Sequence, residues 1–99
     1  MIFQKVKNTL SITVDGAEFL TARNIEFYVK QGSTFFQYTP EVISDTEIVV
    51  TIPYEDAMKL SSFDVYLQLA YTDSNGNVVV TEKSVCPVSA FLKEAGYDA

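Results

Sequence analysis

The stretch that decides the fold is residues 65–80, which reads VYLQLAYTDSNGNVVV. In its first half, Val65, Leu67, Leu69 and Tyr71 alternate with other residues, as in a strand with one buried face. Asn75-Gly76 follows, a pair that favours a tight hairpin turn because both residues tolerate positive φ angles. The valines at 78–80 then form the returning strand. We therefore predict two antiparallel strands joined by a turn at Asn75-Gly76.

The same turn has a second interpretation as a calcium loop. Asp73, Asn75 and Asn77 alternate as the first ligands of such a loop do. An EF-hand loop starting at Asp73 also needs a glycine at its sixth position and a glutamate at its twelfth. Those positions hold Val78 and Ser84. We therefore favour the turn and predict no metal and no other cofactor; a weak calcium site outside the EF-hand pattern is the alternative.

The two-residue period continues outward from this hairpin. Together with it, alternation and turn residues predict seven short strands, at residues 10–14, 17–21, 24–31, 34–38, 47–52, 63–72 and 77–88. Pro53, Glu55 and Asp56 predict a short helical corner near 53–60. Ser89 and Gly96 would bound a short C-terminal helix. Many short strands with regular turns and no long helix are typical of an all-β, antiparallel β-sandwich.

Length and charge narrow the class of protein. With 99 residues, the chain is the size of a single domain, 1–99. Its net charge of −6 repels phosphate backbones and anionic lipids, so we expect no nucleic acid and no membrane as partners. The start, MIFQKVKN, lacks the pattern of a signal peptide, and we expect synthesis in the cytoplasm.

Catalytic chemistry has few candidates. The chain contains no histidine, so Ser-His and Cys-His pairs are impossible. Its one cysteine, Cys86, alternates with valines and is predicted to pack as a small apolar side chain. Glu55 and Asp56 are neighbours in a helical turn and do not face each other. We predict that the protein is not an enzyme.

Aromatic residues are in surplus, with 6 Tyr and 7 Phe. Tyr28 and Tyr66 lie on the polar phase of their strands, while Phe36 and Tyr38 share one face of theirs. Because tyrosine is enriched at the centre of protein interfaces, these four are candidate contact residues. Scattered surface aromatics are the alternative. Phe91 and Leu92 of the predicted C-terminal helix are candidates for a docking element.

The order of strand, helical corner with Glu-Asp, strand, hairpin and strand over residues 51–85 is similar to the end of an immunoglobulin-like domain. A narrower resemblance rests on Gln31-Gly32, Glu55-Asp56, Gln68 and Asp73 to Gly76. These residues, in this order, resemble small immunoglobulin-like virion proteins of phages and prophages of Gram-positive bacteria.

The resemblance implies an immunoglobulin-like sandwich and a structural role in a phage or phage-like particle. The expected role is head decoration, neck, tail or baseplate, within an oligomeric assembly in the virion, after synthesis in the bacterial cytoplasm. The partners would be other virion proteins or copies of itself. The resemblance carries over no catalytic residue. The alternative is an immunoglobulin-like interaction module of a bacterial surface protein, with carbohydrate as a ligand.

Overall fold

The computed structural model describes residues 2–3 and 6–89, which form ten strands and one short helix. The elements are β1 (Ile2–Phe3), β2 (Asn8–Thr13), β3 (Arg23–Gln31), β4 (Thr34–Tyr38), β5 (Glu41–Val42), β6 (Glu47–Ile52), α1 (Tyr54–Ala57), β7 (Val65–Thr72), β8 (Val78–Val80), β9 (Ser84–Cys86) and β10 (Val88–Ser89). The predicted C-terminal helix, with Phe91 and Leu92, lies outside the described residues.

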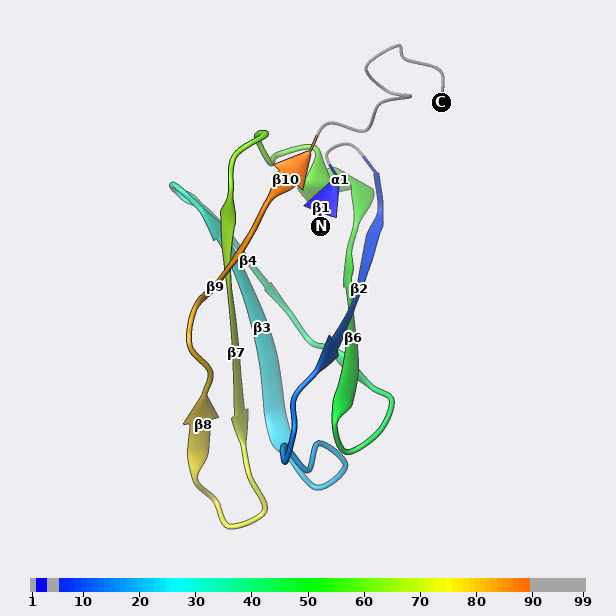
Figure 1. The fold of residues 1–99 in the computed structure, drawn as a ribbon, viewed down its shortest axis with the longest axis vertical. Coiled ribbons are helices and arrows are strands. Elements are labelled where there is room, and N and C mark those ends of the chain that lie inside the picture. The colour runs from blue at the N-terminus through cyan, green and yellow to red at the C-terminus, as the bar shows by residue number, and fades with distance from the viewer. Residues whose placement is uncertain (1, 4–5, 90–99) are drawn as a thin grey trace.

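The strands form two sheets that face each other (Figure 1). One has the order β2-β6-β5. The other has the order β4-β3-β7-β8, and β9 follows β8 along the same side of β7. All pairings in these two sheets are antiparallel, whereas β1 and β10 form a short parallel pair at one end of the sandwich. The predicted immunoglobulin-like antiparallel β-sandwich is therefore confirmed.

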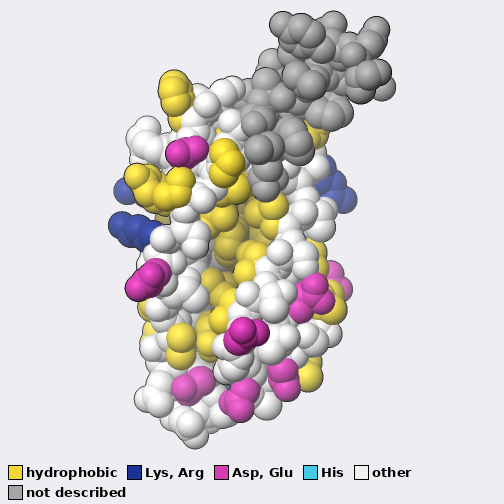
Figure 2. Space-filling model, in the orientation of Figure 1, with side chains coloured by type: hydrophobic (Ala, Val, Ile, Leu, Met, Phe, Trp, Pro, Cys, Tyr) yellow, Lys and Arg dark blue, Asp and Glu magenta, His cyan; other side chains and the backbone are white. Residues whose placement is uncertain are grey.

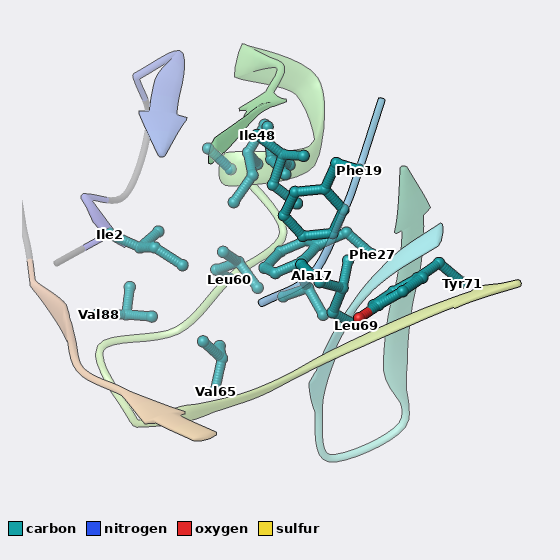
Figure 3. Packing of buried hydrophobic residues seen from close by; sticks show 14 residues of the cluster. Ile2, Ala17, Phe19, Phe27, Ile48, Leu60, Val65, Leu69, Tyr71 and Val88 are labelled. Atoms are coloured by element: carbon teal, nitrogen blue, oxygen red, sulfur yellow. The ribbon is translucent and has the colours of Figure 1, made fainter. Parts of the chain in front are cut away.

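The core lies between the two sheets and follows the predicted alternation. Ile48, Val50 and Ile52 point inward from β6, and Phe27 and Val29 point inward from β3 to meet them. Figure 3 shows the cluster of buried side chains to which they belong. Each fully buried side chain of this size stabilises the fold by about 1.5–3 kcal/mol relative to an exposed one, so the alternating pattern supplies much of the driving force for folding.

Residues 17–21 do not form the predicted strand. Ala17 and Phe19 are buried as their alternation suggests, but Glu18 between them has a φ of 54°, which a strand does not allow. The backbone N–H of Phe19 donates to the carbonyl of Asp45 at 2.8 Å. The segment is thus a loop that closes one end of the sandwich, with the Phe19 ring edge-on to Tyr71 at 5.4 Å between centroids.

The turn between β7 and β8 is one residue longer than predicted. Gly76 has a φ of 84°, but Asn75 does not have a positive φ. The N–H of Gly76 donates to the carbonyl of Asp73, and the N–H of Asp73 donates to the carbonyl of Asn77. Ser74 and Asn75 therefore occupy the centre of a type I turn, with glycine in the left-handed position that follows it.

The last predicted strand is divided into β8, β9 and β10. The N–H of Thr81 still pairs with the carbonyl of Leu69, and Ser84 pairs with Leu67. Glu82 and Lys83 together therefore oppose the single residue Gln68, which is a β-bulge. The Gln68 side chain donates to the carbonyl of Thr81 at 2.9 Å and bridges the break in the ladder.

The predicted helical corner is confirmed as α1, one turn long. Pro53 is its N-cap rather than its first helical residue. Glu55 and Asp56 lie in its first turn, and Ala57 is buried. Lys59 lies just beyond the helix. Across the part of the chain that the structure describes, no helix has the length and apolar character needed to cross a bilayer.

Candidate contact surface

The sheet containing β3 and β7 has an outward side on which aromatic and apolar side chains form a row. Lys30 pairs with Phe35 on β4 and with Tyr66 on β7, and Tyr66 pairs with Val85 on β9. Phe35 is 55% exposed, Tyr66 52% and Val85 57%. Residues directly opposite each other on paired strands lie on the same face of a sheet. The row therefore crosses four adjacent strands, near the end of the sheet where β3 turns into β4.

A second, more polar row runs beside the first. Tyr28 pairs with Gln37 on β4 and with Gln68 on β7. The Tyr28 ring stacks on Phe35, with 5.8 Å between centroids and 26° between planes. This diagonal contact joins the two rows into one surface.

The hydroxyl of Tyr28 donates a hydrogen bond to the carboxylate of Glu26. That bond, together with partial desolvation and the negative charge of Glu26, raises the pKa of Tyr28 above its ordinary value. The Tyr28 hydroxyl is thus paired with Glu26 while its ring stacks on Phe35. Such a ring pair can stack on an incoming planar or apolar group.

Two lysines lie among these rings, Lys30 between Phe35 and Tyr66 and Lys83 beside them. The side chains of Lys30 and Lys83, together with Gly32 and Gln68, join the three rings around a shallow hollow of about 630 Å³. The bulge at Glu82–Lys83 explains the position of Lys83, because the extra residue sends Glu82 toward the gap between the sheets and Lys83 to the outward side. We call Tyr28, Lys30, Phe35, Tyr66, Gln68 and Lys83 the outer-face patch.

Phe36 and Tyr38 lie elsewhere, on the inward side of β4. Their rings stack on each other with 6.1 Å between centroids and pack against the core. The Tyr38 hydroxyl donates to Oδ2 of Asp56 in α1 at 2.8 Å, and Lys59 Nζ lies 6.0 Å from the Phe36 centroid. The structure thus brings Tyr28 and Tyr66 together, whereas Tyr38 contacts α1 and Phe36 lies beside Lys59, just beyond α1.

Sequence reasoning did not select Phe35 and the exposed valines of the same sheet. Alternation divides β4 into two faces but does not say which face is the outer one. The available signal is Gln37, because it shares its face with Phe35 and a glutamine is rarely buried without partners. Val78 and Val80 of β8 also point outward, at 71% and 56% exposed. They extend the apolar surface beyond the outer-face patch.

The described residues contain no group of three or more acidic or cysteine side chains that could hold a metal ion. Oδ1 of Asp73 accepts hydrogen bonds from the N–H groups of Asn75 and Asn77, at 2.9 Å each. The spacing that suggested calcium ligands therefore serves the turn. Cys86 is half-buried opposite Val65 and packs against the core, as predicted.

No protein-family model matches the chain, and no curated protein matches it. Among solved structures, the fold is similar to that of murine CRIg, an immunoglobulin-like domain. The two share 12% sequence identity, with a TM-score of 0.43 over 90% of this chain and 88% of that chain.

Proposed function

We propose that the protein is a non-enzymatic structural or assembly subunit of a phage or phage-like particle, which binds its neighbours through the outer-face patch. The observation that carries the contact role is the exposure of Phe35 and Tyr66 on the outward side of one sheet, where each leaves about half of its surface in water. Exposed aromatic side chains gathered on one face typically mark a protein contact. The resemblance of Gln31-Gly32, Glu55-Asp56, Gln68 and Asp73 to Gly76 supports a place in a virion.

The charges of the patch suggest the chemistry of the partner. Lys30 lies between Phe35 and Tyr66, and Lys83 lines the same hollow, on a chain whose net charge is −6. A partner surface that combines apolar groups with carboxylates would complement them, and such complementarity sets orientation and speeds association. The partner would be another virion protein or another copy of this chain.

The test is incorporation into particles. Changing both Phe35→Ser and Tyr66→Ser should remove the chain from purified particles, as measured by quantitative mass spectrometry, while circular dichroism and melting temperature show an intact fold. Tyr54→Ser is the matched control, because Tyr54 is 49% exposed and lies on α1, away from the patch. Normal incorporation of the double variant would contradict a role for the patch. Absence of the unchanged protein from particles would contradict the virion role.

A second candidate function is carbohydrate binding by an immunoglobulin-like module of a bacterial surface protein. The stacked rings of Tyr28 and Phe35 favour it, because a sugar ring can lie on an aromatic face beside hydrogen-bonding groups such as Gln68. A glycan-array screen distinguishes the two functions. Binding of one glycan class that is lost in Phe35→Ser would support the module, and an absence of binding would contradict it.

A further inference from the structure

β2 forms one edge of the three-stranded sheet, opposite the sheet that carries the outer-face patch. β2 pairs with β6 on one side, and none of the strands in the described ranges pairs with its other side. The N–H of Val14, just after β2, donates to the carbonyl of Thr46 at 2.8 Å. Hydrogen bonding alternates along an antiparallel pair, so the backbone N–H and C=O groups of Asn8, Leu10 and Ile12 also point toward β6. The backbone groups of the intervening residues, Thr9, Ser11 and Thr13, therefore point outward from the sheet edge.

This edge lacks the usual protection against pairing. Exposed edge strands in monomeric proteins commonly carry a lysine, a proline or a bulge that prevents another strand from adding. β2 reads NTLSIT, with no charge and no proline, and its register with β6 is regular over all six residues. The side chains of Thr9, Ser11 and Thr13 are exposed. They are hydroxyl-bearing residues, which pair well across strands.

An apolar groove runs beside the same edge. Ile12 and Val14 form one wall, Leu67 and Leu69 lie between the sheets, and Glu82 lies on the opposite wall, around a volume of about 430 Å³. In Figure 2 hydrophobic side chains line a hollow between the two sheets. A strand added to β2 would lie over the β2 side of this groove and cover apolar surface that is now in contact with water.

The sequence of β2 and its flanks is complementary to itself in one register. In this register two copies pair antiparallel with Ser11 opposite Ser11, so that Thr9 of each copy meets Thr13 of the other. All three outward-facing residues then form hydrogen-bonded pairs, giving about six backbone hydrogen bonds. Leu10 meets Ile12 on the inner face. Lys7 meets Asp15 of the second copy at each end of the seam.

We propose that a second copy of this chain adds to the free edge of β2, so that two three-stranded sheets become one continuous sheet across a two-fold axis. The charges favour this register over a slipped one, because Lys7 and Asp15 are both exposed and of opposite sign. The net charge of −6 on each copy opposes association at long range, and these two local pairs offset part of that repulsion. The inference does not depend on the outer-face patch or on a virion role.

The first test uses backbone hydrogen bonding. Sedimentation velocity of the full chain over a range of concentrations should show a monomer–dimer equilibrium. Ser11→Pro removes an outward-facing N–H without breaking the β2–β6 ladder, and should raise the dimer dissociation constant by about tenfold or more. Ser11→Ala is the matched control: both variants lose the hydroxyl that bonds Glu47 Oε2 at 2.6 Å, but Ala keeps the N–H. Ser11→Ala should dimerise like the unchanged protein.

The second test uses the register. Lys7→Glu alone places two acidic residues opposite each other and should weaken the dimer about threefold or more, and Asp15→Lys alone should do the same with two lysines. The double variant Lys7→Glu with Asp15→Lys should restore the original affinity. In amide exchange followed by NMR, the N–H groups of Thr9, Ser11 and Thr13 should become protected only as the protein concentration rises.

The outcomes separate this inference from the proposed function. A monomer at all concentrations up to about 1 mM would overturn it, as would equal dimerisation of Ser11→Pro and Ser11→Ala. A dimer that persists in Ser11→Pro but is lost in the Phe35→Ser, Tyr66→Ser variant would also overturn it, and would leave the outer-face patch as the contact between copies.

Discussion

Gln31 and Ser61 are joined by two reciprocal hydrogen bonds. The backbone N–H of Ser61 donates to Oε1 of Gln31 at 2.7 Å, and Nε2 of Gln31 donates to the carbonyl of Ser61 at 2.9 Å. The same nitrogen donates to the carbonyl of Phe63, also at 2.9 Å. One side-chain amide at the end of β3 therefore substitutes for a strand partner and holds the loop between α1 and β7 in place.

We expect Gln31→Ala to lower the free energy of unfolding by about 1–2 kcal/mol, because the loop loses three hydrogen bonds and water replaces them only partly. Urea denaturation measures the effect. Gln37→Ala is the control, since Gln37 is an exposed glutamine on the neighbouring strand, and its loss should change stability by less than about 0.5 kcal/mol. Equal effects of the two substitutions would mean that the loop does not depend on Gln31.

Phe19 and Leu20 are neighbours with opposite environments. Phe19 is 1% exposed and Leu20 is 66% exposed. Phe19→Ala should therefore destabilise the fold by about 3–5 kcal/mol through the cavity that it leaves, whereas Leu20→Ala should cost less than about 0.5 kcal/mol. Thermal melts of the two variants measure the difference. If the loop over residues 17–22 packed only loosely, the two melting temperatures would be alike.

Asp73 is expected to act through the turn rather than through calcium. Asp73→Ala removes two backbone-to-carboxylate hydrogen bonds and should lower the free energy of unfolding by about 1–2 kcal/mol. Added calcium chloride should leave the melting temperature of the unchanged protein where it is, because a ligand that binds only the folded state would raise it. A rise that disappears in Asp73→Ala would instead establish a calcium site.

Tyr38 makes the stability of the folded state decrease at alkaline pH. Burial, followed by the hydrogen bond to Asp56, raises the pKa of Tyr38 above its ordinary value of 10.0. The folded state then holds a proton that the unfolded state loses, so the stabilisation is complete below pH 10 and is lost as the pH rises from there through the folded-state pKa.

Urea denaturation at several pH values from 7 to about 11 tests this sign. Tyr38→Phe should be less stable at neutral pH by about 1–2 kcal/mol, and the gap between it and the unchanged protein should close above pH 10. Tyr54→Phe serves as the control, since Tyr54 is exposed and outside the bond to Asp56. A gap that stays constant with pH would show that the proton on Tyr38 is not linked to folding.

Much of the fold can be read from the sequence because strand alternation reports burial directly. Ile48, Val50 and Ile52 occupy alternate positions of the strand predicted at residues 47–52, and all three are buried. The same signal fails at residues 17–21. Ala17 and Phe19 alternate correctly, but alternation does not reveal the positive φ of Glu18 or the bond from Phe19 to Asp45, which lies far away in the chain.

The candidate site was only partly predictable, for a related reason. Tyr28 and Tyr66 could be assigned to an outer face because their strands have clear polar phases. β4 has aromatic residues on both faces, and only its pairing with β3 shows that Phe35 is outside and Phe36 inside. Likewise, the valine run gives no warning of the bulge that turns Lys83 outward, because the cause is a register shift opposite Gln68.

The parallel pairing of β1 with β10 has a mechanical consequence. The N–H of Ile2 donates to the carbonyl of Pro87 at 3.2 Å, and Ile2 and Val88 are both buried between the sheets. In a parallel pair, the leading end of one strand and the trailing end of the other point in opposite directions. Tension applied through Ile2 and Ser89 therefore loads their contacts in shear, all at once, rather than peeling them apart in sequence.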